Sequence, residues 1–291
     1  MAFNFGVEFE LCLRLKQNYM NQLPANPNAD QIRREIARLL NSTGVNIWPG
    51  LPTGSPYLRW RILGDPSIQP PPSYIAAEFT TPVFPYSDYW QYTIDDFFQY
   101  LTAICDVQIN HTCSTHIHIS RHGAAYETRH VAKFLKAIEY YEEALQQFIP
   151  AERQNTPYAE KNTKVMAVFG ALQLHIPLQQ ARATVYNTIN THAHAGSLLP
   201  LVYGDVRNLA WNFCNLNPGG IQTIECRFPP GVTDSRSANH WIAFALGFMA
   251  NALSVQWPNT PAGNRSNTAQ LRAAVQQGAN SIIAHTHALL L

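Results

Sequence analysis

Four short segments of this 291-residue chain alternate between apolar side chains and side chains able to carry chemistry. In residues 5–15, apolar side chains occupy every second position, with Glu8, Glu10 and Arg14 between them. A period of two is that of a β-strand that buries one face. The same pattern predicts strands at residues 58–62, 114–120 and 223–228.

The polar faces of these predicted strands have an unusual composition. An ordinary solvated strand face mixes Thr, Ser and Lys with other charges, whereas these faces are dominated by Glu, His and Arg and hold no Lys. We therefore expect the polar face of the sheet to be the functional surface. Helices are expected to cover its apolar face.

Helical spacing of apolar residues predicts six helices, at residues 30–40, 93–104, 127–148, 165–176, 235–257 and 267–290. Because strands and helices do not alternate regularly, the predicted fold class is α+β with an antiparallel or mixed sheet and helices on one face. Residues 1–291 are expected to form a single domain. Two expected loops, at residues 42–56 and 184–203, would shape the substrate pockets.

Composition excludes several classes of protein. The formal charge of +1 gives no electrostatic reason to expect a nucleic-acid or anionic-membrane partner, and 46% hydrophobic with 13% charged residues excludes a disordered chain or a coiled coil. The first residues lack a basic signal segment, and no apolar run is long enough to span a bilayer. Five cysteines without C-x-x-C spacing indicate a reducing, cytoplasmic location.

Two carboxylates share one face of the first predicted strand. Glu8 and Glu10 lie roughly 6–7 Å apart from the strand rise alone. Such a pair needs either solvent or a cation, and Mg²⁺ or Mn²⁺ takes oxygen ligands of this kind. An exposed edge strand explains the pair equally well. Glu78, at the head of an apolar run, and Glu225, beside Arg227, supply two further carboxylates.

Histidines show a similar pairing. His116 and His118 share one strand face, which fits metal ligation, phosphate contact or proton transfer. The His-x-His spacing recurs at residues 192–194, in an expected loop, and at residues 285–287, in an expected C-terminal helix. Those two repeats are interpreted as coincidental.

Several arginines are candidates to hold phosphate or carboxylate oxygens through paired hydrogen bonds. For any one of them, a surface ion pair is the alternative, but Arg227 shares a strand face with Glu225. The candidates are Arg59, Arg61, Arg153, Arg207 and Arg227. The sequence contains no G-x-x-x-x-G-K-[ST], G-x-G-x-x-G, H-E-x-x-H or G-x-S-x-G motif, so a bound nucleotide would not use a Walker loop.

The order of the motifs along residues 5–257 resembles that of the putative amidoligase family, a branch of the carboxylate–amine ligases that are similar to glutamine synthetase and glutamate–cysteine ligase. The motifs are Phe-Gly-Val-Glu-Phe-Glu-Leu at 5–11, Trp-x4-Asp-x-Ser-Ile at 60–68, Glu-Phe-Thr-Thr-Pro at 78–82, Ser-Thr-His-Ile-His-Ile at 114–119, Asn-Phe-Cys-Asn-Leu-Asn-Pro-Gly-Gly at 212–220 and Thr-Ile-Glu-Cys-Arg-Phe-Pro-Pro-Gly at 223–231. The resemblance implies a glutamine-synthetase-like sheet that binds ATP and two or three Mg²⁺ ions, with Mn²⁺ as a possible substitute.

The resemblance also implies roles for individual residues. Its metal ligands would be Glu8, Glu10, Glu78 and Glu225. His116 and His118 would lie near the metal or the nucleotide, and the residues assigned to nucleotide binding are His116, His118, Asn215 and Arg227. Arg227 would contact the transferring phosphate, and Arg59, Arg61 and Arg207 are the further catalytic candidates from the set of arginines above. Asp65 matches the first residue of an Asp-Gly-Ser turn in which Pro66 replaces Gly, and Ser114 and Thr115 replace the Gly expected before the His-x-His strand.

Together these features predict an ATP- and Mg²⁺-dependent ligase that forms an amide from a small carboxylic acid, such as an amino acid, and an amine. The reaction is uphill in water, so the acid would be activated as an acyl phosphate, and metal ions and arginines would neutralise the phosphate charge. Two alternatives stay open. One is a metal-dependent hydrolase in which His116, His118 and the acids activate water. The other is a non-catalytic descendant that binds a metabolite or another protein.

Overall fold

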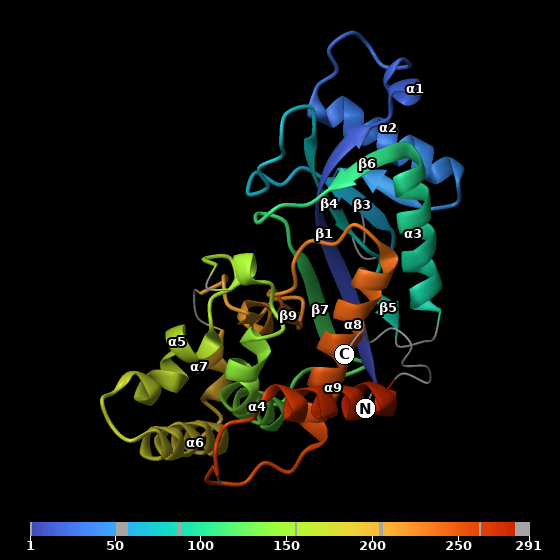
Figure 1. The fold of residues 1–291 in the computed structure, drawn as a ribbon. Coiled ribbons are helices and arrows are strands. Elements are labelled where there is room, and N and C mark those ends of the chain that lie inside the picture. Colours follow the sequence, from blue (N-terminus) through green and yellow to red (C-terminus); the bar gives the residue numbers. More distant parts are fainter. Residues whose placement is uncertain are drawn as a thin grey trace. The chain divides into compact units, whose positions relative to one another are not determined.

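Strand β1 (Phe3–Leu15) is the element around which one part of the chain is built (Figure 1). The computed structural model describes residues 2–50, 58–85, 89–154, 156–203, 206–261 and 263–282. It divides into two units, whose boundaries fall inside a strand and a helix. Unit 1 comprises Met1–Phe3, His118–Phe228 and Ala243–Leu291, and unit 2 comprises Asn4–Ile117 and Pro229–Ile242.

The sheet of unit 2 is mixed. Its strands follow the order β2-β3-β4-β1-β7, in which β2 and β3 are parallel and β4 is antiparallel to both β3 and β1. Short strands β5 and β6 also pair antiparallel with β1. The bounds are β2 (Ile47–Pro49), β3 (Trp60–Leu63), β4 (Ile75–Thr80), β5 (Phe84–Pro85), β6 (Cys105–Gln108) and β7 (Thr115–Arg121). The predicted mixed sheet with helices is thus confirmed.

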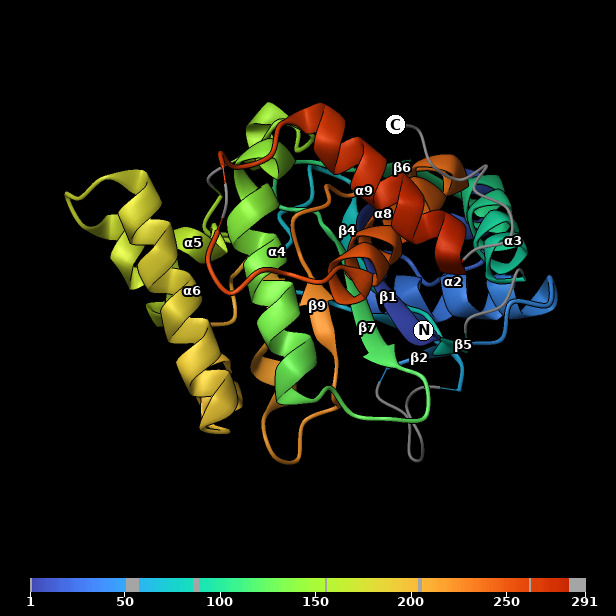
Figure 2. The same ribbon diagram turned by 90° about the horizontal axis from the view of Figure 1, so that it is seen from below.

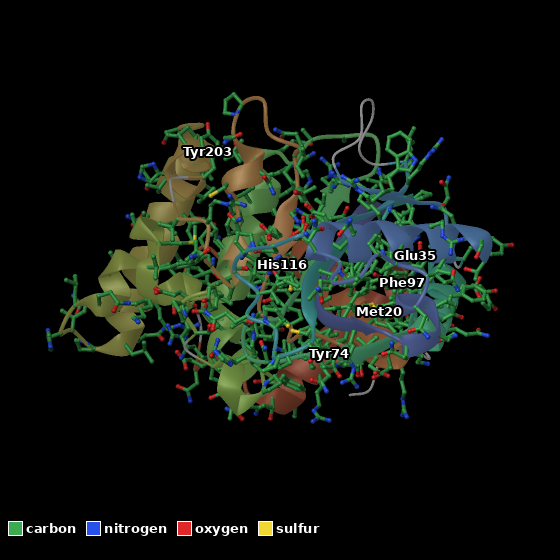
Figure 3. The ribbon with its side chains drawn as sticks, turned by 90° about the horizontal axis from the view of Figure 1, so that it is seen from above. Met20, Glu35, Tyr74, Phe97, His116 and Tyr203 are labelled. Carbon is green, nitrogen blue, oxygen red and sulfur yellow. The ribbon has the colours of Figure 1, made fainter. Side chains whose placement is uncertain are left out.

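Aromatic packing covers the apolar face of this sheet. Phe97 of α3 (Trp90–Ile104) stacks on Trp60 with ring centroids 4.2 Å apart and meets Phe79 edge-on at 5.0 Å. Phe9 packs against Phe97 and Phe98, and all five rings are buried. Phe97 is labelled in Figure 3. Burying rings of this size is the main source of stability for such a layer.

The described residues of unit 2 form two further helices and the start of a third. They are α1 (Gln17–Met20), α2 (Ala29–Ser42) and the first residues of α8 (Ser235–Ser254). Helix α2 begins with a capping box, in which the Asn28 side chain accepts from the Gln31 amide and the Gln31 side chain accepts from the Asn28 amide. The predicted helices at 30–40 and 93–104 are α2 and α3.

Unit 1 combines the strand order β7-β9-β8 with a set of helices, some of which lie side by side in Figure 2. Its core is again aromatic: Phe134 of α4 meets Trp211 edge-on at 4.9 Å, and Phe248 of α8 stacks on Trp211 at 5.3 Å. The bounds are α4 (Thr128–Gln146), α5 (Asn162–Val165), α6 (Leu178–His194), α7 (Leu198–Val202), α9 (Thr268–Ile282), β8 (Trp211–Asn212), β9 (Ile224–Cys226) and the 3-10 turns η1 (Ala151–Arg153), η2 (Ala167–Gln173) and η3 (Cys214–Leu216).

Two sequence-based expectations for unit 1 are wrong. Residues 165–176 form the end of α5 and the 3-10 turn η2 instead of one α-helix, because Met166 is extended between them. Residues 184–203 are not a loop, since most of α6 and all of α7 lie there. His192 and His194 therefore belong to the last turn of α6 and not to a loop. The His-x-His pair at residues 285–287 and the end of the other expected loop, residues 51–56, lie outside the described residues.

The predicted helices at 127–148, 235–257 and 267–290 correspond to α4, α8 and α9, the last described as far as Ile282. Within the described part of the chain, no helix combines the length and apolar character required to cross a membrane.

Helices α8 and α9 approach each other at two glycines. A Cβ placed on Gly278 would lie 1.9 Å from the carbonyl oxygen of Gly247, which no side-chain motion can relieve. We expect Gly278→Ala to lower the free energy of unfolding by about 1–3 kcal/mol, as overpacking of a core does. Gly170→Ala is the matched control, because a Cβ there meets nothing within 4 Å. Thermal melting of both variants checks this, and equal melting temperatures would contradict it.

Candidate active site

Three carboxylates converge on the polar face of the unit 2 sheet. Glu10 of β1 stands directly opposite Glu78 of β4, and Asp65 follows β3, the next strand. Each offers one carboxylate oxygen, and these oxygens all lie within 4.8 Å of one another. We call Glu10, Asp65 and Glu78 the acidic cluster.

A tight turn places Asp65 in this cluster. The Asp65 carbonyl oxygen accepts from the Ile68 amide at 3.3 Å, and its Oδ1 accepts from the Ser67 amide at 2.7 Å. Pro66 occupies the second position of this turn, where its fixed φ is favourable and its missing N–H is not needed. The replacement of Gly by Pro66 therefore keeps the turn that carries Asp65.

Burial and neighbouring negative charge both act on Glu78 in the acidic cluster. The pKa of Glu78 is raised to about 8, first by burial and then by the charges of Glu8, Asp65 and Glu10, while the cation of Arg61 opposes the shift. Carboxylates held this close are stabilised by a cation, and a set of carboxylate oxygens suits a hard divalent ion such as Mg²⁺ or Mn²⁺. The donor chemistry of the cluster thus fits the expected metal.

His116 lies against the carboxylates of the first strand. Its Nδ1 is 3.1 Å from Glu8 Oε2, and its Nε2 is 3.7 Å from Glu10 Oε1. The imidazole is 5% exposed, whereas Glu8 keeps 29% of its side chain exposed. His116, labelled in Figure 3, is therefore oriented by Glu8 and Glu10.

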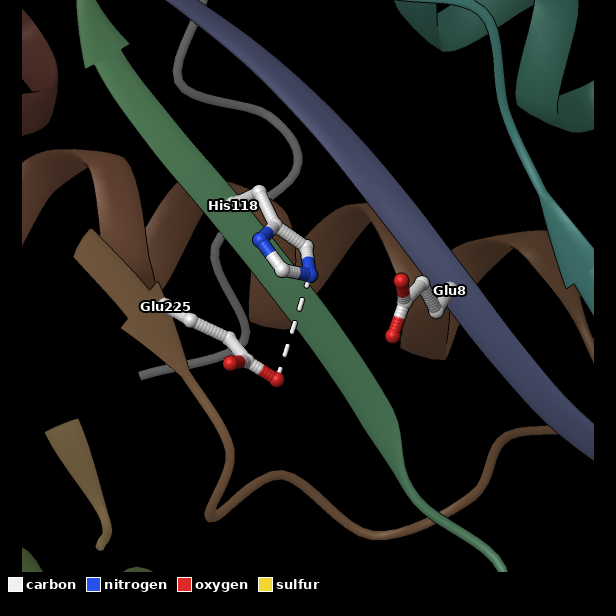
Figure 4. A group of neighbouring side chains, drawn as sticks. All are labelled: Glu8, His118 and Glu225. Atoms are coloured by element: carbon white, nitrogen blue, oxygen red, sulfur yellow. Dashed lines mark ion pairs between the residues drawn. The ribbon is translucent and has the colours of Figure 1, made fainter. Parts of the chain in front are cut away.

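A second cluster lies in unit 1 around Glu225, whose side chain is 3% exposed. Asn212 pairs with Glu225 across β8 and β9 and donates from Nδ2 to Glu225 Oε2 at 2.7 Å. The Arg227 guanidinium donates to Oε1, and His118 Nε2 lies 3.8 Å from the same oxygen. We call Asn212, Glu225, Arg227 and His118 the Glu225 cluster. Figure 4 draws His118 and Glu225 with their ion pair, together with Glu8 of β1.

The other nitrogen of His118 meets a turn between η3 and β9. His118 Nδ1 lies 3.2 Å from Thr223 Oγ1 and 3.4 Å from Asn215 Nδ2. The turn is closed by a hydrogen bond of 2.9 Å from the Gln222 amide to the Asn215 carbonyl oxygen, and a Cβ on Gly220 would lie 2.4 Å from that oxygen. Glycine at position 220 thus permits the turn that brings Asn215 to His118.

The predicted arginines lie in different places. Arg61 belongs to the polar face of unit 2, where its Nε donates to Thr80 Oγ1 at 2.8 Å. Arg59 lies over the Trp48 ring, 4.7 Å from its centroid, and lines a pocket of about 430 Å³ together with Asp96. Arg207 is exposed, and among the described residues no contact joins it to the Glu225 cluster.

Arg153 lies beside Arg227 instead. Its side chain is buried, and its Nη2 donates to the Arg227 carbonyl oxygen at 3.3 Å. The Arg227 Nε in turn donates to the Tyr158 carbonyl oxygen at 3.4 Å. The guanidinium of Arg227 is therefore held from two sides, by Tyr158 and by Glu225.

Sequence reasoning did not assign site roles to Asp65, Asn212 or Thr223. All three stand within the motifs that carry the family resemblance, so each carried a signal. Their contacts depend on cross-strand register, which a single strand's periodicity does not reveal.

The chain belongs to the putative amidoligase family, since a family model described as "Putative amidoligase enzyme" matches residues 2–249. The match contains every residue of the acidic cluster and of the Glu225 cluster. This membership supports a ligase activity. A search of curated proteins finds no match.

The raised pKa of Glu78 predicts a pH-dependent stability. Its folded pKa of about 8 exceeds the ordinary value of 4.5, so the native state retains a proton that the unfolded state releases. The stabilising contribution is full below about pH 4.5 and is lost as the pH rises through about 8.

In EDTA, the melting temperature of the wild type should accordingly fall between pH 5 and pH 8 more steeply than that of Glu78→Gln. Asp96→Asn, which changes an exposed acid, is the control. Parallel curves for the wild type and Glu78→Gln would refute the shift.

Proposed function

We propose that this protein is an ATP- and Mg²⁺-dependent ligase with a glutamine-synthetase-like catalytic fold. It joins a small carboxylic acid, such as an amino acid, to an amine through an acyl phosphate. Membership of the amidoligase family supports the reaction class. The single observation that carries the cofactor assignment is the convergence of Glu10, Asp65 and Glu78 oxygens within 4.8 Å on one sheet face.

The chemistry accounts for the cofactors. An amide does not form spontaneously from a carboxylate and an amine in water, and ATP with Mg²⁺ or Mn²⁺ supplies the phosphoryl group that activates the acid. In this proposal the acidic cluster holds a divalent cation. Glu8 and Glu225 are further carboxylates for metal binding, and His116 orients Glu8 and Glu10 through its two ring nitrogens.

The Glu225 cluster fits the handling of phosphate. Arg227 has a planar guanidinium that is fixed by Glu225 and by the Tyr158 carbonyl oxygen, so it can present its remaining donors without reorganising. Asn212 donates a hydrogen bond to the second carboxylate oxygen of Glu225, which fixes the Glu225 side chain in turn. His118 and Asn215 would contribute nucleotide contacts beside Arg227.

The proposal is tested by product formation. Purified protein would be incubated with a panel of carboxylic acids and amines plus ATP and Mg²⁺, and ADP and new amide masses would be measured together. ADP release coupled to an amide supports the ligase. Hydrolysis of amides without ATP would instead indicate the metal-dependent hydrolase, and neither product would indicate a binding protein.

Nucleotide binding should depend on a divalent cation. We expect a non-hydrolysable ATP analogue to bind only in the presence of Mg²⁺ or Mn²⁺, because the carboxylates otherwise repel the triphosphate.

Glu10→Gln should keep the fold and weaken Mn²⁺ binding by about tenfold or more, since it removes one charge from the cluster. Calorimetric titration of Mn²⁺ into the wild type and Glu10→Gln measures this loss. Titration of the ATP analogue with and without EDTA measures the cation dependence, and equal affinity for the analogue in EDTA would be incompatible with this assignment.

Arg227 should matter more for turnover than for binding. Lysine keeps the charge but loses the two-pronged geometry, so Arg227→Lys is expected to lower kcat by about 10²-fold while nucleotide affinity changes much less. Arg236→Lys, at an exposed position of α8, is the control. If Arg227→Lys keeps full kcat, the phosphate contact lies elsewhere, with Arg61 the next candidate.

A further inference from the structure

The side chain of Arg33 reaches from helix α2 to the end of two strands of unit 2. Its Nη1 donates to the carbonyl oxygen of Ala76, in β4, at 2.8 Å, and its Nη2 pairs with Asp30 one helical turn earlier. Only 14% of the Arg33 side chain is exposed. The guanidinium is thus fixed by two partners on different elements.

The same guanidinium lies flat against Gly64, the residue that follows β3. A Cβ on Gly64 would lie 2.9 Å from Arg33 Nη2, 3.0 Å from its Cζ and 3.1 Å from its Nη1. These distances are shorter than ordinary contacts of a Cβ, so the absence of a side chain on Gly64 allows the approach. Arg33 therefore contacts the backbone of both β4 and the corner after β3.

These two backbone contacts flank the acidic cluster. Gly64 immediately precedes Asp65, and Ala76 stands two residues before Glu78 on the same strand. We propose that Arg33 is a positioning residue: it fastens the Gly64–Asp65 corner to β4 and so sets the spacing between the Asp65 and Glu78 carboxylates. The inference rests on the proposed function, because it takes the acidic cluster to hold a divalent cation.

Spacing of this kind controls cation affinity. Mg²⁺ requires near-ideal octahedral geometry with short metal–oxygen distances, so a small displacement of one ligand weakens binding. Residues that orient ligands without touching the metal typically change metal affinity by roughly 10–100-fold when they are replaced. Arg33 is expected to act in that range.

An ordinary helix-surface ion pair would have no such effect, and α2 carries one for comparison. Arg38 pairs with Glu35 at the same i,i+3 spacing as Arg33 with Asp30, but 58% of the Arg38 side chain is exposed. Arg33→Met and Arg38→Met each remove a guanidinium and an ion pair from the same helix. Only Arg33→Met also removes the contacts to Ala76 and Gly64.

The test titrates Mn²⁺ alone into each protein by calorimetry and records its melting temperature. Arg33→Met should bind Mn²⁺ about 10–100-fold more weakly than the wild type, and Arg38→Met should bind it like the wild type. Gly64→Ala tests the same contact with Arg33 intact. Gly64 and Arg33 both line a pocket of about 210 Å³, so the added methyl can push the guanidinium aside without unfolding the strand.

The double variant separates positioning from general destabilisation. If Arg33 and Gly64 act through one contact, Arg33→Met with Gly64→Ala binds Mn²⁺ no more weakly than Arg33→Met alone. Independent, additive losses of Mn²⁺ affinity in the two single variants would overturn the positioning role. Wild-type Mn²⁺ affinity in Gly64→Ala would overturn it as well. If Arg33→Met does not fold, the affinity of Gly64→Ala alone decides between the two outcomes. Failure of the wild type itself to bind Mn²⁺ would overturn the proposed cation site and the role of Arg33 with it.

Discussion

The direct opposition of Glu10 and Glu78 across β1 and β4 is the constraint on which the site depends. Like charges placed opposite each other weaken a strand pair, and here one of the two is also buried enough to raise its pKa to about 8. The other face of the same pair holds the register, because Phe9 stands opposite Phe79 and both pack on Phe97. A slip of one residue would turn these rings toward the carboxylates, so the aromatic layer forces the acids together.

Local periodicity explains why much of the candidate site could be predicted from the sequence. Glu8, Glu10 and His116 lie on polar strand faces because each alternates with buried apolar neighbours, a pattern that one strand displays by itself. The proximity of Asp65 to Glu78, and of Asn212 to Glu225, depends on which strands pair and in which register. Those are long-range properties, and no window of a single sequence contains them.

The helices show the same division between local and tertiary information. Most of helix α6 lies where a loop was expected at residues 184–203, yet the helix buries Ala181, Val185 and Ile189 on one face. Its Arg182 forms a buried ion pair with Glu139 of α4, which anchors it by a contact 43 residues away in the chain. The prediction for residues 165–176 was wrong in the opposite sense, because an α-helix was expected and is not formed. Their apolar spacing suits a helix, but Met166 is extended.

Charge balance then distinguishes the buried Glu139 from the acidic cluster. Glu139 is fully buried but forms ion pairs with both Arg182 and Arg265. These two arginines neutralise its charge, so no further cation is needed there. The acidic cluster has the reverse balance: three carboxylates converge, and Arg61 is the cation that opposes the charge on Glu78. A buried charge that the protein neutralises itself stabilises the fold, whereas a surplus of negative charge raises a pKa until a cation binds. The surplus of negative charge around Glu78, added to the burial of that carboxyl group, is therefore the physical argument for the divalent-cation site proposed on this sheet face.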